Sequence, residues 1–124
     1  MKSKSLFRPG ENIAMKVPPD EFAATVAFYR DTLGFPVLDP DNEGSVIFDF
    51  GGKKLWIDNV PALSRAELWL EVVTSDSRAA AQHLKEQGIV RRDDIEPLPE
   101  GLAAFWIKSP SGTIHLVTEE ENVS

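Results

Sequence analysis

The chain has 124 residues, no cysteine, and 20 acidic against 13 basic side chains, for a net charge of −7. This length fits one domain that buries a core without disulfides, and the missing cysteines exclude a cysteine nucleophile and a thiolate metal site. A negative field disfavours nucleic acid and anionic membrane surfaces as partners. Because no long apolar run occurs, and none follows the basic start Met1–Ser5, we expect no membrane span, no signal peptide and a cytoplasmic location.

The first half of the chain predicts a strand, a helix and three further extended segments. Residues 12–17 alternate between apolar and polar, which is typical of a half-buried strand. Asp20 is expected to cap the helix that follows, and Gly34 to end it in the left-handed conformation. A Gly51-Gly52 hairpin turn joins the last two of the extended segments, which are expected at residues 35–38, 45–50 and 55–58.

The second half repeats this order at a nearly constant offset. A strand is expected at residues 67–72, a helix capped by Ser75 or Asp76 and ended by Gly88, and strands at 102–108 and 114–118. Such a repeat indicates two similar units whose helices cover apolar sheet faces. The sequence therefore predicts an α+β fold in a single domain, residues 1–124, with a first βαβββ module at 8–61 and a second at 62–120.

Two motifs make the chain resemble a known superfamily. The helix end Phe28-Tyr-Arg-Asp-Thr-Leu-Gly-Phe35 and the late turn Ser109-Pro-Ser-Gly-Thr113 are similar to motifs of the glyoxalase/bleomycin resistance/extradiol dioxygenase (vicinal oxygen chelate) superfamily. The resemblance implies two βαβββ modules whose mixed sheet curves into a half-barrel cleft, with the helices outside. It does not fix the chemistry, because this fold hosts lyases, isomerases, epimerases, dioxygenases and metal-free drug-binding proteins.

The resemblance also implies where a metal ion would be held. In the metal enzymes, two ligands open the modules' first strands and are often His; these positions fall on Asn12 and Glu67. Two more lie on the closing strands and are usually Glu. The first of these falls on Trp56 or, two residues on, Asp58.

The second closing position falls on Leu116, or on His115 if one residue is deleted. The set that remains mixes oxygen and nitrogen donors: Asn12, Asp58, Glu67 and His115. Zn, Mn, Fe or Ni could be bound by such a set. Because two of the four positions depart from the pattern, the sequence favours a degenerate site, with a divalent metal as the alternative.

Strand alternation gathers aromatic and charged side chains on the expected cleft face. Lys16 lies on this face in the first half, and Glu67, Trp69 and Glu71 lie on it in the second. Trp56, Asp58 and Trp106 are expected to add to the same wall. Carboxylates beside indoles suit a flat cationic or neutral aromatic ligand. The alternative is that these Trp residues fill an interface or a second core.

Two further residue groups admit a catalytic or binding role. Glu67 could act as a general acid or base in the cleft, although the sequence favours the interpretation that Glu67 and Glu71 reach solvent at a strand end. Residues 91–94, Arg-Arg-Asp-Asp, are interpreted as a self-paired exposed turn rather than an anion site.

The sequence therefore predicts a homodimeric small-molecule-binding protein of this superfamily, one that could sequester an antibiotic or a metabolite. The alternatives are a metal-dependent lyase, isomerase or dioxygenase using Glu67, His115 and Asp58, and an interaction domain without a ligand. The homodimer is expected because unpaired sheet edges need to be covered.

Overall fold

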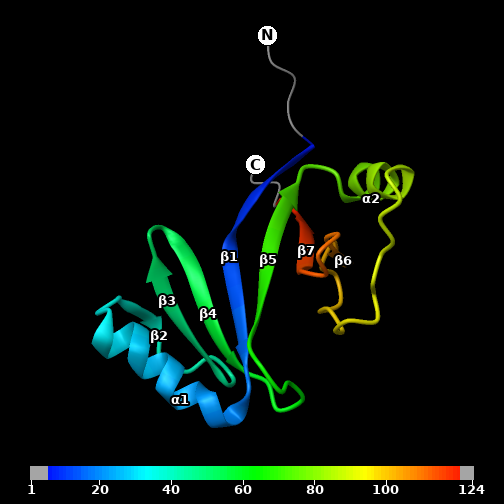
Figure 1. The fold of residues 1–124 in the computed structure, drawn as a ribbon. Coiled ribbons are helices and arrows are strands. Elements are labelled where there is room, and N and C mark those ends of the chain that lie inside the picture. Colours follow the sequence, from blue (N-terminus) through cyan, green and yellow to red (C-terminus); the bar gives the residue numbers. More distant parts are fainter. Residues whose placement is uncertain (1–5, 121–124) are drawn as a thin grey trace. The chain divides into compact units, whose positions relative to one another are not determined.

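The structure is a computed structural model that describes residues 6–120, so the basic start Met1–Ser5 lies outside the described residues. The described chain forms two compact units, one of residues 11–69 and one of residues 6–10 together with 70–120, called here the first and the second unit. The strands and α-helices, labelled in Figure 1, are β1 (Phe7–Val17), α1 (Pro19–Ala27), β2 (Val37–Asp39), β3 (Ser45–Phe50), β4 (Lys53–Asn59), β5 (Glu67–Thr74), α2 (Ser77–Glu86), β6 (Ala104–Lys108) and β7 (Ile114–Glu119). A π-helical turn (Phe28–Thr32) directly follows α1.

The first unit is a mixed sheet covered by α1. Its strands lie in the order β2-β3-β4-β1, with β1 parallel to β4 and the other neighbours antiparallel. Gly51 and Gly52 form the predicted hairpin turn between β3 and β4, at φ of 65° and 90°. Only residues that tolerate positive φ fit both positions of such a turn, so the two glycines set the register of the hairpin.

The core of this unit lies on the helix side of the sheet. Val17, Phe48, Leu55 and Ile57 are at most 3% exposed and pack with Val26 of α1. Because successive strand residues point to opposite faces, burying Leu55 and Ile57 under the helix turns Trp56 and Asp58 to the other face. The apolar core thus creates the polar face on which the candidate site lies.

The second unit contains α2 and strands in the order β5-β7-β6, with β5 parallel and β6 antiparallel to β7. Its core joins Ala80 of α2 to Phe105 and Val117, all at most 2% exposed. Residues 87–103, between α2 and β6, contain no strand. The α+β class and the helix-over-sheet units are as predicted, and the second repeat is one strand shorter than the first.

One helix cap differs from the prediction. Pro18 caps α1 without a side-chain hydrogen bond, and Asp20 lies in the first turn. The reason is that Pro19 starts the helix with a fixed φ, so the chain is already helical at Asp20. Asp76 caps α2 as predicted, since its carboxylate accepts hydrogen bonds from the backbone N–H groups of Arg78 and Ala79.

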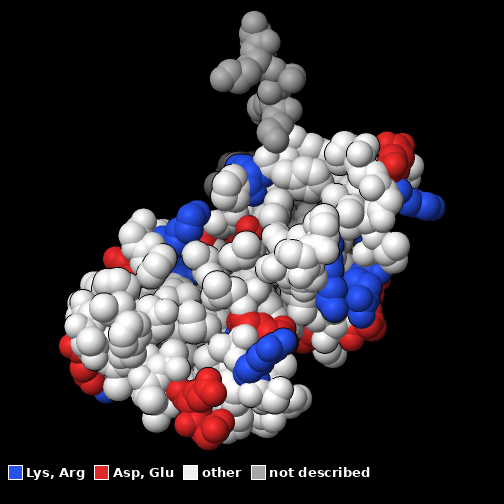
Figure 2. All heavy atoms as spheres, viewed as in Figure 1, with Lys and Arg blue, Asp and Glu red and all other residues white. Residues whose placement is uncertain are grey.

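Charged side chains are scattered over the visible surface rather than gathered by sign. Figure 2 shows several small groups in which red and blue atoms lie close together, and a red group without blue atoms at the bottom of the view. In residues 91–94 the charges pair with one another, Arg91 with Asp93 and Arg92 with Asp94, as the sequence predicted. None of the helices in residues 6–120 combines the length and the apolar character needed to cross a bilayer.

Candidate functional site

The candidate site is the face of the first unit's sheet that is turned away from α1. On this face β1 carries Asn12 and Lys16, β4 carries Trp56 and Asp58, and β5 adds Trp69 at its start. The parallel register of β1 and β4 places Lys16 directly beside Asp58. We call these five residues the polar face.

A nearly buried ion pair lies at the centre of the polar face. The Lys16 ammonium is 2.8 Å from Asp58 Oδ2, and their side chains are only 13% and 12% exposed. Ser45 of β3 donates a hydrogen bond to the other carboxylate oxygen of Asp58, Oδ1, over 2.5 Å. The ammonium also lies over the ring of Trp69, with Nζ 4.3 Å from the ring centroid. Such a cation–π contact adds about 0.5–2 kcal/mol, depending on how far water is excluded.

The two indoles of the polar face are held by hydrogen bonds to side chains. Trp56 Nε1 donates to Asn12 Oδ1 over 2.8 Å, and Trp69 Nε1 donates to Glu67 Oε1 over 3.0 Å. Both indoles are half-buried, so part of each ring stays accessible. An indole fixed at its N–H keeps its ring face in a constant place, which lowers the entropy cost of stacking on a ligand.

The polar face carries less net negative charge than the sequence suggested. Lys16 compensates Asp58 directly, and Glu67 is exposed to solvent. Glu71 belongs to the second unit, where it accepts a hydrogen bond from the Thr118 hydroxyl over 3.3 Å. The carboxylate-rich wall that alternation predicted is therefore, in the first unit, one compensated carboxylate and one solvated carboxylate.

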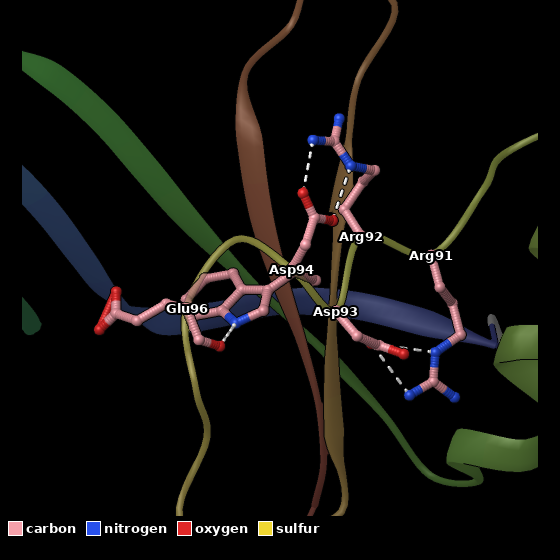
Figure 3. A network of polar contacts seen from close by, with 6 residues as sticks. Arg91, Arg92, Asp93, Asp94 and Glu96 are labelled. Carbon is pink, nitrogen blue, oxygen red and sulfur yellow. Dashed lines mark hydrogen bonds and ion pairs between the residues drawn. The ribbon is translucent and has the colours of Figure 1, made fainter.

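Two predicted site residues lie on opposite faces of the second unit. Trp106 is 6% exposed, and its Nε1 donates to the Glu96 carbonyl over 2.9 Å (Figure 3). In β7 His115 alternates with Leu116, and it is Leu116 that pairs with Trp106 and Glu71. His115 thus lies on the same face of β7 as the buried core residue Val117. Its Nδ1 lies 3.0 Å from the Thr113 carbonyl oxygen, which can only accept, so this nitrogen is the donor.

The residues of the first unit do not fit a metal ion. Asn12 Oδ1 accepts the indole hydrogen bond, and both Asp58 oxygens are engaged, one by the ammonium of Lys16 and one by Ser45. To bind Asp58, a metal ion would have to displace the Lys16 ammonium, which already compensates the charge of this carboxylate. Among residues 6–120, no three His, Asp or Glu side chains are grouped closely enough to hold a metal ion. The sequence-based prediction of a degenerate metal site is to be tested by metal analysis of the protein.

Two surface hollows of the first unit lie away from the polar face. One, of about 360 Å³, runs along α1 and is lined by Met15, Asp20, Glu21, Ala24, Thr25, Phe28 and Tyr29. The other, of about 400 Å³, is lined by Phe35, Pro36, Asp49, Phe50 and Gly51 near the hairpin turn. Neither includes a residue of the polar face, so both are separate features of the unit.

Ser45 is the residue of this site that sequence reasoning missed. It faces Asp58 across the β3–β4 hairpin, and counting outward from the Gly51-Gly52 turn pairs the two residues. The signal was therefore present in the hairpin itself. The contact of Lys16 with Asp58 depends on β1 lying parallel to β4, which no local pattern reveals.

Comparisons with known proteins agree on the fold. No family model matches the sequence, and no curated protein matches it. The structure is similar to a hypothetical protein from Bacillus halodurans C-125, with TM-score 0.68 and 14% identity over 97% of this chain and 99% of that one. It is similar to methylmalonyl-CoA epimerase from Mycobacterium tuberculosis, with TM-score 0.60 and 17% identity over 98% and 94% of the chains.

A third similar structure is a glyoxalase/bleomycin resistance protein/dioxygenase superfamily member from Vibrio splendidus 12B01, with TM-score 0.58 and 14% identity over 87% and 97% of the chains. The chain therefore has the fold of the glyoxalase/bleomycin resistance/dioxygenase superfamily, and the resemblance drawn from the sequence motifs is confirmed at that level. At these identities the likeness carries the fold and not the chemistry.

Proposed function

We propose that the protein binds a small, flat organic molecule on the polar face without a metal ion. The observation that carries this proposal is the Lys16–Asp58 pair, because Lys16 engages one carboxylate oxygen of Asp58 and Ser45 engages the other, so that neither oxygen is open to a metal. The half-buried rings of Trp56 and Trp69 supply stacking surface. Stacking on an aromatic ring needs no metal and tolerates many flat ligands.

The ligand class follows from charge. The chain carries a net charge of −7, which repels anions, so neutral or cationic aromatics are preferred over phosphorylated or other anionic molecules. A protein of this kind would hold its ligand rather than transform it, as in sequestration of an antibiotic or a metabolite. Glu67 remains the candidate acid or base if the bound molecule is also turned over.

A melting experiment tests this function. Protein treated with a chelator is heated with a panel of flat neutral, cationic and anionic molecules, and binding raises the melting temperature according to ligand concentration and affinity. Neutral or cationic aromatics should raise it, and Trp69→Leu should reduce the shift. Phe105→Leu is a matched control in the core of the second unit. Preferential stabilisation by the anions would contradict the proposal.

Several similar structures have names that include glyoxalases and dioxygenases, among them a manganese-bound glyoxalase from Novosphingobium aromaticivorans. A metal-dependent enzyme is therefore the second candidate. Metal analysis of gently purified protein decides between the two. One equivalent of Zn, Fe, Mn or Ni, removed by Glu67→Ala, would favour the enzyme, and a substoichiometric content would favour the binding protein.

A further inference from the structure

The setting of Lys16 has the chemistry of a ligand site. A carboxylate oxygen of Asp58 lies 2.8 Å from its ammonium, and the face of Trp69 lies 4.3 Å away. Ser45 holds the second carboxylate oxygen and so fixes the orientation of the first. A carboxylate and an aromatic face around one nitrogen are the groups with which proteins recognise ammonium ligands.

We propose that Asp58 and Trp69 form a primary-ammonium site, and that Lys16 fills this site from within the chain. The ammonium of Lys16 stands there as an internal ligand tethered by its own strand, β1. The site suits a primary ammonium because one N–H points at the carboxylate, which a quaternary ammonium cannot reproduce. Its low exposure, 13% for Lys16 and 12% for Asp58, strengthens both contacts relative to the surface.

This filling makes Lys16 the residue that sets the charge selectivity of the polar face. An incoming cation would have to expel the Lys16 ammonium from its carboxylate and its aromatic face. A neutral ligand does not compete with Lys16 for the carboxylate of Asp58 and can stack on the part of each indole that stays accessible. The consequence for natural ligands rests on the function proposed above and narrows it from cationic or neutral molecules to neutral ones. The ammonium site itself can be tested without knowing any natural ligand.

Chemical rescue tests the site directly. Lys16→Ala removes the three outer methylenes and the ammonium, which n-propylammonium can replace. The variant should melt below the wild type, and n-propylammonium should raise its melting temperature by a few degrees in a saturable way. The wild type and the matched control Lys54→Ala, a half-exposed lysine on the same strand face as Asp58, should show no saturable shift. Sodium and tetramethylammonium at equal ionic strength should not replace n-propylammonium.

Variants of Asp58 and Trp69 test whether the rescue by n-propylammonium depends on these two residues. Adding Asp58→Asn to Lys16→Ala should abolish the rescue, and adding Trp69→Leu should weaken it. A shift of equal size with sodium, in the Lys54→Ala control, or in the double variant with Asp58→Asn would overturn the proposal. So would the absence of any shift in folded Lys16→Ala protein.

A second measurement covers the case in which Lys16→Ala does not fold. Because the natural chain has no cysteine, Lys16→Cys carries a unique thiol. Aminoethylation of the unfolded variant rebuilds a side chain of nearly lysine length that ends in an ammonium, and S-propylation rebuilds the same length without charge. The aminoethylated protein should refold to near wild-type stability, and the propylated protein should not. Equal stability of the two products would contradict the proposal.

The ligand consequence is measured separately, with phenethylammonium and its neutral analogue 2-phenylethanol. The wild type should bind the neutral molecule more tightly, and Lys16→Ala should reverse the order. If neither molecule binds but n-propylammonium rescues, the ammonium site stands and the proposed ligand face fails. If both bind in the expected order without rescue, the ligand face stands and the ammonium site fails.

Discussion

Lys16 and Asp58 lose most of their hydration when the first unit folds, and each depends on the other to offset that cost. Taking one partner away leaves a charge in a poorly hydrated place, which costs more than the pair itself contributes. Both carboxylate oxygens of Asp58 have a partner, so this arrangement is satisfied throughout. The contribution of the polar face to the stability of the first unit therefore depends on Lys16 and Asp58 both being present.

Lys16→Met removes the charge and keeps the length of the side chain. Because it leaves Asp58 without its ion-pair partner, we expect the free energy of unfolding to fall by about 3 kcal/mol. Lys54→Met is the control, since Lys54 is half exposed and lies 3.7 Å from Glu11. Its loss should stay below about 1 kcal/mol, as for exposed pairs. Urea unfolding measures both variants, and equal losses would show that Lys16 is only a surface lysine.

At the scale of elements, residues 91–96 form a strap along the edge strand β6. The backbone N–H of Arg92 donates to the Trp106 carbonyl, and the Glu96 carbonyl accepts from the Trp106 indole. The guanidinium of Arg91 lies over the Phe105 ring, 4.8 Å from its centroid. The strap thus touches both faces of β6 and occupies a hydrogen-bonding edge that could otherwise pair with another chain.

Trp106→Phe tests the attachment of the strap. It removes the indole N–H that binds Glu96, a hydrogen bond that contributes about 1 kcal/mol. We expect faster amide hydrogen exchange in residues 91–96, with α2 affected less. Trp56→Phe, which loses the comparable bond to Asn12 in the first unit, should leave the exchange of the strap unchanged. Unchanged exchange in Trp106→Phe would mean that the strap is held by its other contacts.

The ion pair between Arg92 and Asp94 in the strap should affect how the Asp94 carboxyl titrates in acid. Hydrogen bonds from the Arg92 guanidinium lower the pKa of Asp94 below its ordinary value. A carboxyl whose folded pKa is lowered stabilises the fold above its unfolded pKa, and this contribution is lost as the pH falls through the folded pKa. Carboxyl NMR should find Asp94 titrating below the ordinary range, and Arg92→Gln should raise its pKa. The pKa of Asp31, lowered in the same way by Arg30, should not move in this variant and serves as the reference.

The sequence predicted these elements unevenly, for physical reasons. The Gly51-Gly52 hairpin and the Asp76 cap depend on residues close together in the chain, and both could be predicted. Alternation also placed Trp56 and Asp58 on one face correctly. It could not reveal that Lys16 lies beside Asp58, because parallel pairing depends on the whole unit. Nor could it reveal that the loop buries Trp106, since burial by a loop leaves no periodic pattern.

For the whole molecule, the prediction that remains to be tested is its association state. Exposed apolar side chains lie along the edge strand of the first unit, with Val37 37% and Leu38 53% exposed. Because such edges tend to be covered, we expect a homodimer, as the sequence predicted. Sedimentation velocity at micromolar concentration measures this, and a single monomeric species would contradict it.

Binding of a small molecule to the polar face without a metal can be observed directly at the indoles. The chain has three tryptophans, so the indole N–H region of a ¹⁵N NMR spectrum can report each of them. We would titrate chelator-treated protein with a neutral flat aromatic that raises the melting temperature. We expect saturable shifts of the Trp56 and Trp69 indole signals while the buried Trp106 signal stays in place. Shifts confined to Trp106, or shifts that occur only after a divalent metal is added, would contradict this expectation.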